Sequence, residues 1–178
     1  MSLNLLHDIT PGDDVPNKIT VVVEIPKGSK NKYELDKKTG LIKLDRVMKT
    51  SQDYPFDYGF VPQTHWHDGD PLDVVIITTY PLIPNILIDV RPVAVMDMID
   101  HGESDAKIIA VPCEDPRFDN VNDLADINPH FIKEVTHFFT TYKTMQDKVV
   151  TIEDVHGKDE ALQIVTQAIE MYKKKNNK

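Results

Sequence analysis

Three carboxylates lie within six residues in the segment Asp68-Gly-Asp-Pro-Leu-Asp73, where a turn leads into an apolar run. Oxygen ligands at this density are typical of sites for hard divalent cations such as Mg²⁺, Mn²⁺ or Ca²⁺. An EF-hand loop is excluded, because its twelfth position must be acidic and here that position is Thr79. Asp-Gly pairs are also common in turns, so a solvated acidic turn is the alternative for this segment alone.

A second acidic cluster, Asp100-His-Gly-Glu-Ser-Asp-Ala-Lys107, joins two apolar runs. If residues 105–111 are extended, Asp105 and Lys107 project from the same face of a strand. A metal ligand and a cation suited to phosphate oxygens would then lie side by side. The alternative for this cluster is a hairpin loop with ordinary surface charges.

Several charged residues occupy positions in strand-like segments. Lys32 and Glu34 are two residues apart and would project from the same face of a strand, and Arg46 follows an apolar run. Most charged side chains on strands are solvated, so a surface role is the alternative for each. Glu24 interrupts the apolar run 19–25, just before Pro26. The alternative to a functional role is that this residue simply ends the strand.

Other reactive side chains give weaker signals. His65 and His67 would face the same way on a strand, as a zinc pair does, but no further His or Cys lies at a familiar spacing. Cys113 is the only cysteine, which excludes an internal disulfide and agrees with a reducing compartment. The aromatic segment 54–60 predicts core, where the hydroxyl of Tyr58 would need a polar partner.

The elements that must position these residues are mostly short apolar strands separated by Gly and Pro, which predict an all-β barrel or sandwich rather than βαβ units. The expected strands cover residues 19–25, 32–36, 41–47, 72–78, 86–98 and 107–111. Two amphipathic helices follow, the first capped by Asn128 and Pro129 and the second covering about 161–172. We expect both to pack on the strands, a short extra helix over residues 3–9, and one domain over residues 1–178.

Composition limits the function classes. The 178 residues include 40% hydrophobic and 28% charged residues, as in ordinary globular proteins. A net charge of -9 opposes binding to nucleic acid or an anionic membrane, so we predict neither partner. No apolar run is long enough to span a bilayer and residues 1–11 lack a basic region, which predicts a cytoplasmic protein. An anionic substrate would require a local basic cluster or bound divalent cations.

Together these motifs, in this order and spacing, resemble the soluble family I inorganic pyrophosphatases. The matching segments are 24–26, 32–34, 54–59, 68–73, 100–107 and 142–143. The resemblance covers roughly residues 15–175, and the acidic hexapeptide is its sharpest element. It implies an α+β fold that is mainly β, with a five-stranded OB-like closed barrel and peripheral helices.

The resemblance also implies an activity and an assembly. The reaction would be Mg²⁺-dependent hydrolysis of pyrophosphate to two orthophosphates, by in-line attack of a metal-bridged water, with Mn²⁺ or Zn²⁺ as substitute ions. Because the length is that of compact bacterial members, it implies a homohexamer. His137 lies off the apolar stripe of its helix, where a contact between subunits or a solvated side chain would fit.

Thirteen site residues are carried over on this resemblance. Asp70 would be the base acting on the attacking water. The metal ligands would be Asp68, Asp73, Asp105 and Asp100, with Glu34 and Glu24 acting through water. The groups contacting phosphate oxygens would be Lys32, Arg46, Tyr58, Lys107, Tyr142 and Lys143.

Two other functions fit parts of the sequence. An OB-type barrel that binds single-stranded nucleic acid could stack bases on Tyr54, Tyr58, Phe60 and Trp66, but such proteins are basic along the strand path. A metal-dependent hydrolase of another phosphate ester is the second alternative. The chain carries no Gly-rich phosphate loop or nucleoside-binding motif that would favour it.

Overall fold

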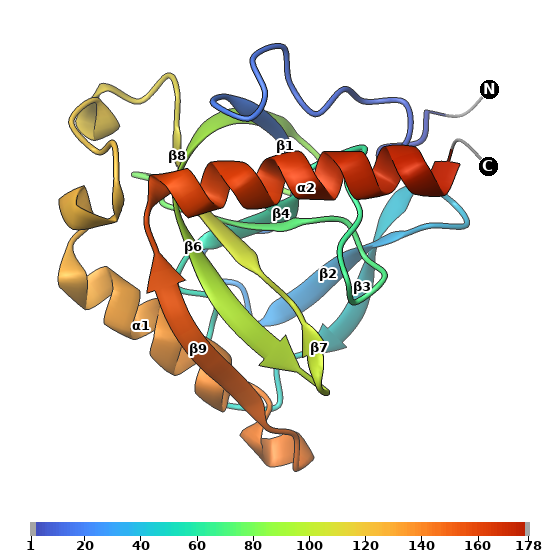
Figure 1. Cartoon of the computed structure of the whole chain (residues 1–178). Coiled ribbons are helices and arrows are strands. Elements are labelled where there is room, and N and C mark those ends of the chain that lie inside the picture. The colour runs from blue at the N-terminus through green and yellow to red at the C-terminus, as the bar shows by residue number, and fades with distance from the viewer. Residues whose placement is uncertain (1–2, 177–178) are drawn as a thin grey trace.

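Five strands close into a barrel at the centre of the computed structural model, which describes residues 3–176 (Figure 1). Around the ring the order is β1 (Ile19–Ile25), β4 (Asp57–Phe60), β5 (Asp73–Ile76), β8 (Lys107–Pro112) and β6 (Leu87–Asp100). β6 pairs with β1 and closes the ring. Only the β5–β8 pair of this ring is parallel. The predicted closed barrel of five strands is therefore confirmed.

β6 is longer than its barrel neighbours, and its second half carries extra strands. β9 (Val150–His156) runs antiparallel beside it, and the short β7 (Glu103–Ser104) folds back on its end (Figure 1). In that turn Asp100 pairs with Glu103, so the second acidic cluster sits on a hairpin. The hairpin places Asp100 and Asp105 at the same end of the barrel.

A separate two-stranded hairpin lies against the barrel near β1. It consists of β2 (Asn31–Asp36) and β3 (Leu41–Val47), and its register pairs Lys32 with Arg46. The strand β1 has a bulge at Glu24, because Val23 pairs with Gly59 while Ile25 pairs with Tyr58. A bulge inserts one extra residue and re-aims its side chain.

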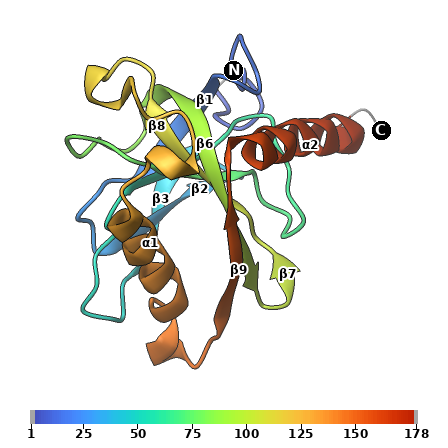
Figure 2. The same cartoon turned by 60° about the vertical axis from the view of Figure 1, so that its left-hand side comes forward.

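Two helices cover the barrel. α1 (Pro129–Thr141) begins where the Asn128 side chain accepts a hydrogen bond from the His130 backbone N–H, as the sequence predicts. It packs Val135, Phe138 and Phe139 against the core. α2 (Lys158–Asn176) crosses the barrel with a narrow face of small and branched residues, and Figure 2 shows it projecting well away from α1. Three short 3-10 helices, Pro116–Phe118, Leu124–Asp126 and Thr144–Gln146, fill the connections.

The expected helix over residues 3–9 is wrong. The segment forms only a turn, in which the Asn4 carbonyl accepts hydrogen bonds from the backbone N–H groups of His7 and Asp8. Seven residues are too few to offset the cost of helix nucleation without extensive packing. Leu6 nevertheless holds the turn in place by packing against Val22 and Phe60.

Three strands were not expected from the sequence: β4, β7 and β9. β4 lies inside the aromatic segment, and its four residues are all buried, so no alternation of polar and apolar residues marks it. β9 has a register shift opposite Asp97 and Met98, which breaks its alternation. Within residues 3–176, no helix has both the length and the apolar character needed to cross a membrane.

Candidate active site

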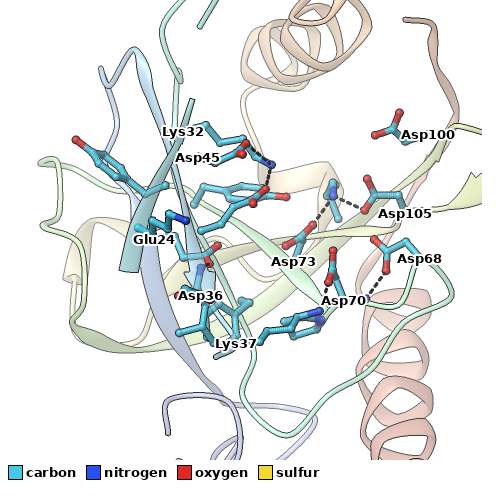
Figure 3. Close-up of a pocket in the computed structure, with 18 of the residues that line it drawn as sticks. Glu24, Lys32, Asp36, Lys37, Asp45, Asp68, Asp70, Asp73, Asp100 and Asp105 are labelled. Carbon is cyan, nitrogen blue, oxygen red and sulfur yellow. Dashed lines mark hydrogen bonds and ion pairs between the residues drawn. The ribbon is translucent and has the colours of Figure 1, made fainter. Parts of the chain in front are cut away.

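An open cavity of about 820 Å³ lies between the barrel, the β2–β3 hairpin and the chain after α1 (Figure 3). Twelve of the thirteen predicted site residues line it. They are Glu24, Lys32, Glu34, Tyr58, Asp68, Asp70, Asp73, Asp100, Asp105, Lys107, Tyr142 and Lys143. Arg46 is the exception, because it does not line the cavity.

The parallel pairing of β5 with β8 builds the floor of the cavity. It aligns Asp73 with Lys107 at the start of the two strands, and the Lys107 Nζ lies 2.5 Å from an Asp73 carboxylate oxygen. Lys107 also forms an ion pair with Asp105, two residues before it, as expected from their shared parity. Burial alone would lower the pKa of Lys107, which is 3% exposed, but these two carboxylates raise it well above its usual value.

Negative charge exceeds positive charge on this floor. Burial raises the pKa of Asp73, and repulsion from Asp105 adds to the effect. Burial likewise raises the pKa of Asp105, with a further contribution from Asp68. The pKa of Asp68 is raised too, first by burial. One ammonium among three such carboxylates leaves an excess that a bound cation would relieve.

The acidic hexapeptide forms a tight loop at the cavity wall. The Asp70 carbonyl accepts a hydrogen bond from the Trp66 N–H at 2.8 Å, and the Trp66 carbonyl accepts one from the Gly69 N–H at 3.1 Å. Gly69 has a φ of +91°, a conformation that glycine adopts without strain. The Asp70 side chain is exposed and pairs with Lys37 from the hairpin turn (Figure 3).

Asp100 ends β6 and pairs with Lys143, which follows α1. Burial alone would raise the pKa of Asp100, but the hydrogen bond and charge of Lys143 outweigh it and lower the pKa. Its other oxygen, Oδ1, is buried and accepts no hydrogen bond within residues 3–176, although His101 Nδ1 lies 2.8 Å away. A buried carboxylate oxygen without an aligned donor is a suitable cation ligand.

Glu24 reaches the cavity because of the bulge in β1. Its side chain is 7% exposed, and one carboxylate oxygen accepts a hydrogen bond from the Leu35 backbone N–H at 2.7 Å. Burial, reinforced by the charge of Asp73, raises the pKa of Glu24 to about 8. The carboxyl group thus links the barrel to the hairpin. This contact argues against the alternative in which Glu24 only ends the strand.

The phenols of Tyr58 and Tyr142 line the side nearest α1. Both side chains are 7% exposed, and burial raises the pKa of each above its usual value, so both are neutral hydrogen-bond donors at pH 7. Tyr142 is the C-cap residue of α1 and stacks on Phe138. The helix therefore fixes Tyr142 and presents the following Lys143 to the cavity.

The hairpin supplies the remaining cations. Lys32 pairs with Glu34, and Arg46 Nη1 lies 2.6 Å from Asp45. Burial lowers the pKa of Lys143, and the charges of Lys32 and Arg46 lower it further. Lys37 and Asp45 were not predicted as site residues. Their contacts depend on the cross-strand register and the shape of the turn, which a local sequence pattern does not encode.

The residues fit a divalent cation by chemistry. Within residues 3–176 no three His, Cys, Asp or Glu side chains already converge as a metal cage, and lysine ammonium groups stand among the carboxylates. The donors are nevertheless all oxygen, their charge is in excess, and Asp100 Oδ1 has no aligned donor. His65 lies beside Lys175, so the weak zinc-pair hypothesis gains no support from these side chains.

Comparison with known proteins gives a consistent result. A family model described as inorganic pyrophosphatase matches residues 21–173. The chain is 45% identical over 166 residues to soluble inorganic pyrophosphatase 2 of Chlamydomonas reinhardtii, covering 93% of this chain and 86% of that protein. It is 42% identical over 173 residues to the inorganic pyrophosphatase of Picrophilus torridus, covering 97% and 98%.

Solved structures agree on the fold. The crystal structure of inorganic pyrophosphatase from Thermus thermophilus matches with a TM-score of 0.93 and 42% identity, over 96% of this chain and 99% of that chain. The inorganic pyrophosphatase from Neisseria gonorrhoeae matches with a TM-score of 0.87 and 36% identity, over 92% and 96%. The fold and the overall sequence thus agree with one family over nearly the whole chain.

Proposed function

The chain belongs to the inorganic pyrophosphatase family, and we propose that it hydrolyses inorganic pyrophosphate to two orthophosphates in a Mg²⁺-dependent reaction. One observation carries this proposal beyond the family name. A single cavity holds seven aspartates together with lysines and neutral phenols, and these are the two sets of groups that a phosphate anhydride and its divalent cations require.

The carboxylates would hold the cations. Asp68, Asp73 and Asp105 would bind the first ion. Asp100 would bind a further ion through Oδ1, the buried oxygen that accepts no hydrogen bond from the described residues. Glu34 and Glu24 would act through water. Bound Mg²⁺ would neutralise substrate charge and acidify a water for in-line attack on phosphorus.

A second set of residues would hold the phosphate groups. Lys32, Lys143, Tyr58 and Tyr142 line the cavity and would contact phosphate oxygens, and Arg46, which pairs with Lys32 across the hairpin, would join them. Lys107 would complete the set, since its buried ammonium pairs with Asp73 and Asp105 and lies 5.7 Å from the centre of the Tyr58 ring. Negative charge developing on the leaving phosphate would be stabilised by these donors.

Asp70 would be the base. Its side chain is exposed at the cavity wall beside the buried carboxylates, so it can take a proton from the attacking water. Its ion pair with Lys37 would break or loosen during this step, because the ammonium occupies the carboxylate. Because both side chains are exposed, opening this ion pair would cost little free energy.

The direct test compares phosphate release from pyrophosphate, ATP and a simple phosphomonoester with Mg²⁺. We expect hydrolysis of pyrophosphate to exceed the other two by orders of magnitude, and to stop when EDTA removes the metal. Comparable rates on all three substrates would favour a general phosphohydrolase instead. Oligonucleotide binding in metal-free buffer would favour the nucleic-acid alternative.

A further inference from the structure

One side chain joins the two acidic segments directly. The indole Nε1–H of Trp66 donates a hydrogen bond to the Ser104 hydroxyl at 3.3 Å. Trp66 precedes Asp68 by two residues, and Ser104 immediately precedes Asp105. The contact therefore bridges 38 residues of sequence between the two segments that carry the proposed metal ligands.

Trp66 is firmly held on its own side. It is 5% exposed, and its indole belongs to the core cluster that includes Leu72, Val74 and Ala106. Its backbone N–H and C=O both bond within the acidic loop, to Asp70 and Gly69. A displacement of the Trp66 ring would consequently move the loop that carries Asp68.

Ser104 is held equally well on the other side. It pairs with Ile99 across the β6–β7 turn, and the next N–H, that of Asp105, donates to the Met98 carbonyl at 2.8 Å. The Ser104 backbone is therefore fixed relative to that of Asp105. Figure 3 shows the Asp68 and Asp105 carboxylates side by side at this end of the cavity.

We infer that Trp66 and Ser104 are positioning residues that set the separation of Asp68 and Asp105 for a shared divalent cation. The inference rests on the proposed function, because it concerns the metal site of that reaction. Neither side chain lines the cavity, so both act through the carboxylates next to them. Without the serine hydroxyl, the indole N–H would be buried without this partner and the two segments would lose their direct link.

The experiment uses the full chain and Mg²⁺ alone. Trp66 is the only tryptophan, so its emission reports on this contact and on Mg²⁺ binding without any substrate. Mg²⁺ titrations would compare wild type, Ser104→Ala, Ser104→Thr and the control Ser51→Ala. Ser51 is exposed, and its hydroxyl makes no hydrogen bond within residues 3–176.

We expect Ser104→Ala to shift the Trp66 emission and to raise the Mg²⁺ dissociation constant by about 2- to 10-fold, the equivalent of one hydrogen bond. Ser104→Thr, which keeps the hydroxyl, should return the constant to within about 2-fold of wild type. Ser51→Ala should change neither quantity. At saturating Mg²⁺, the kcat of Ser104→Ala should approach that of wild type, because the reacting groups remain.

Trp66→Phe provides a second route, with Mg²⁺ binding measured by calorimetry. It keeps an aromatic ring but removes the donor, so its loss of affinity should match that of Ser104→Ala, and the double variant should lose no more than either. If wild type binds Mg²⁺ and Ser104→Ala binds it equally well, the inference is wrong. If wild type neither binds Mg²⁺ nor hydrolyses pyrophosphate, the proposed function fails instead.

Discussion

At the scale of single residues, the central feature is a buried lysine shared by two aspartates. Lys107 contacts Asp73 and Asp105, and all three lie on the floor of the cavity. A buried charge is tolerated only when it is paired, so each of these groups depends on the others. Because two carboxylates share one ammonium, the group keeps an excess of negative charge that would favour binding of a cation.

The roles of Asp70 and Asp73 should separate by metal rescue. Asp70→Asn should bind Mg²⁺ almost normally, because the buried aspartates remain, and should slow hydrolysis by roughly 10²- to 10⁴-fold as for a lost base. Asp73→Asn should weaken Mg²⁺ binding, so that excess Mg²⁺ restores part of its activity. Steady-state rates across a Mg²⁺ series test this, and equal rescue of both variants would identify Asp70 as another ligand.

Glu24 should make stability depend on pH in the metal-free protein. Below about pH 4.5 its carboxyl group is protonated in both the folded and the unfolded chain, so it contributes nothing. Between there and about pH 8, the unfolded chain ionises this group while the folded chain keeps it protonated, so stability falls as pH rises. The loss has an upper bound of roughly 5 kcal/mol.

Glu24→Gln removes this ionisation while keeping an oxygen for the Leu35 N–H. In EDTA, thermal unfolding should therefore show the variant stabilised over wild type at pH 8.5 and little changed at pH 4.5. A stabilisation of the same size at both pH values would contradict the assignment, because it would not arise from a titrating group.

At the scale of elements, the site depends on close approach between β1 and β4. Gly59 of β4 pairs with Val23, next to the bulge at Glu24 and beside the phenol of Tyr58. A Cβ at Gly59 would lie 2.1 Å from the Val22 carbonyl oxygen, a contact that backbone atoms relieve only by moving. The absence of a side chain there lets the two strands pair.

Gly59→Ala should therefore lower the free energy of unfolding by about 3 kcal/mol or more, as measured by urea denaturation. Gly28→Ala is the matched control. Gly28 has a φ of +84° but open space around it, so alanine should cost only the roughly 1 to 2 kcal/mol of a left-handed conformation. A Gly59→Ala protein as stable as the control would mean that β1 and β4 separate readily.

At the scale of the whole molecule, one segment exposes several large apolar side chains. Tyr80, Ile83 and Leu87 are 71%, 66% and 51% exposed in the single chain. Exposed apolar groups that cluster in this way commonly mark contacts with another protein. These residues are therefore a candidate contact surface for the homohexamer that the resemblance implies, and the exposed His137 on α1 is a second candidate.

We predict that the 20.3 kDa chain sediments mainly as a hexamer at micromolar concentration. Ile83→Asp should shift the protein toward smaller species, because a charge would be buried at the contact. Val149→Asp is the control, since Val149 is 82% exposed but lies far along the chain from this segment. Sedimentation of wild type as a monomer alone would refute the assembly.

The sequence by itself determined the mainly β fold and the two helices, and its resemblance to one family identified twelve of the residues that line the cavity. Apolar runs broken by Gly and Pro predicted all six expected strands to within two residues of their observed bounds, and the shared parity of Asp105 and Lys107 predicted their contact. These features are local: they depend on residue type and on the spacing of a few neighbours along one strand or helix.

Only the tertiary structure decided which distant groups meet. The parallel pairing of β5 with β8 brings Asp73 to Lys107 across 34 residues, and the bulge in β1 turns Glu24 into the cavity instead of ending the strand. The register of the hairpin likewise pairs Arg46 with Lys32 across its two strands. The packing of the hairpin on the barrel brings Lys37 against Asp70. Such contacts depend on how strands pair, and strand pairing is settled by burial of the whole core rather than by any single segment.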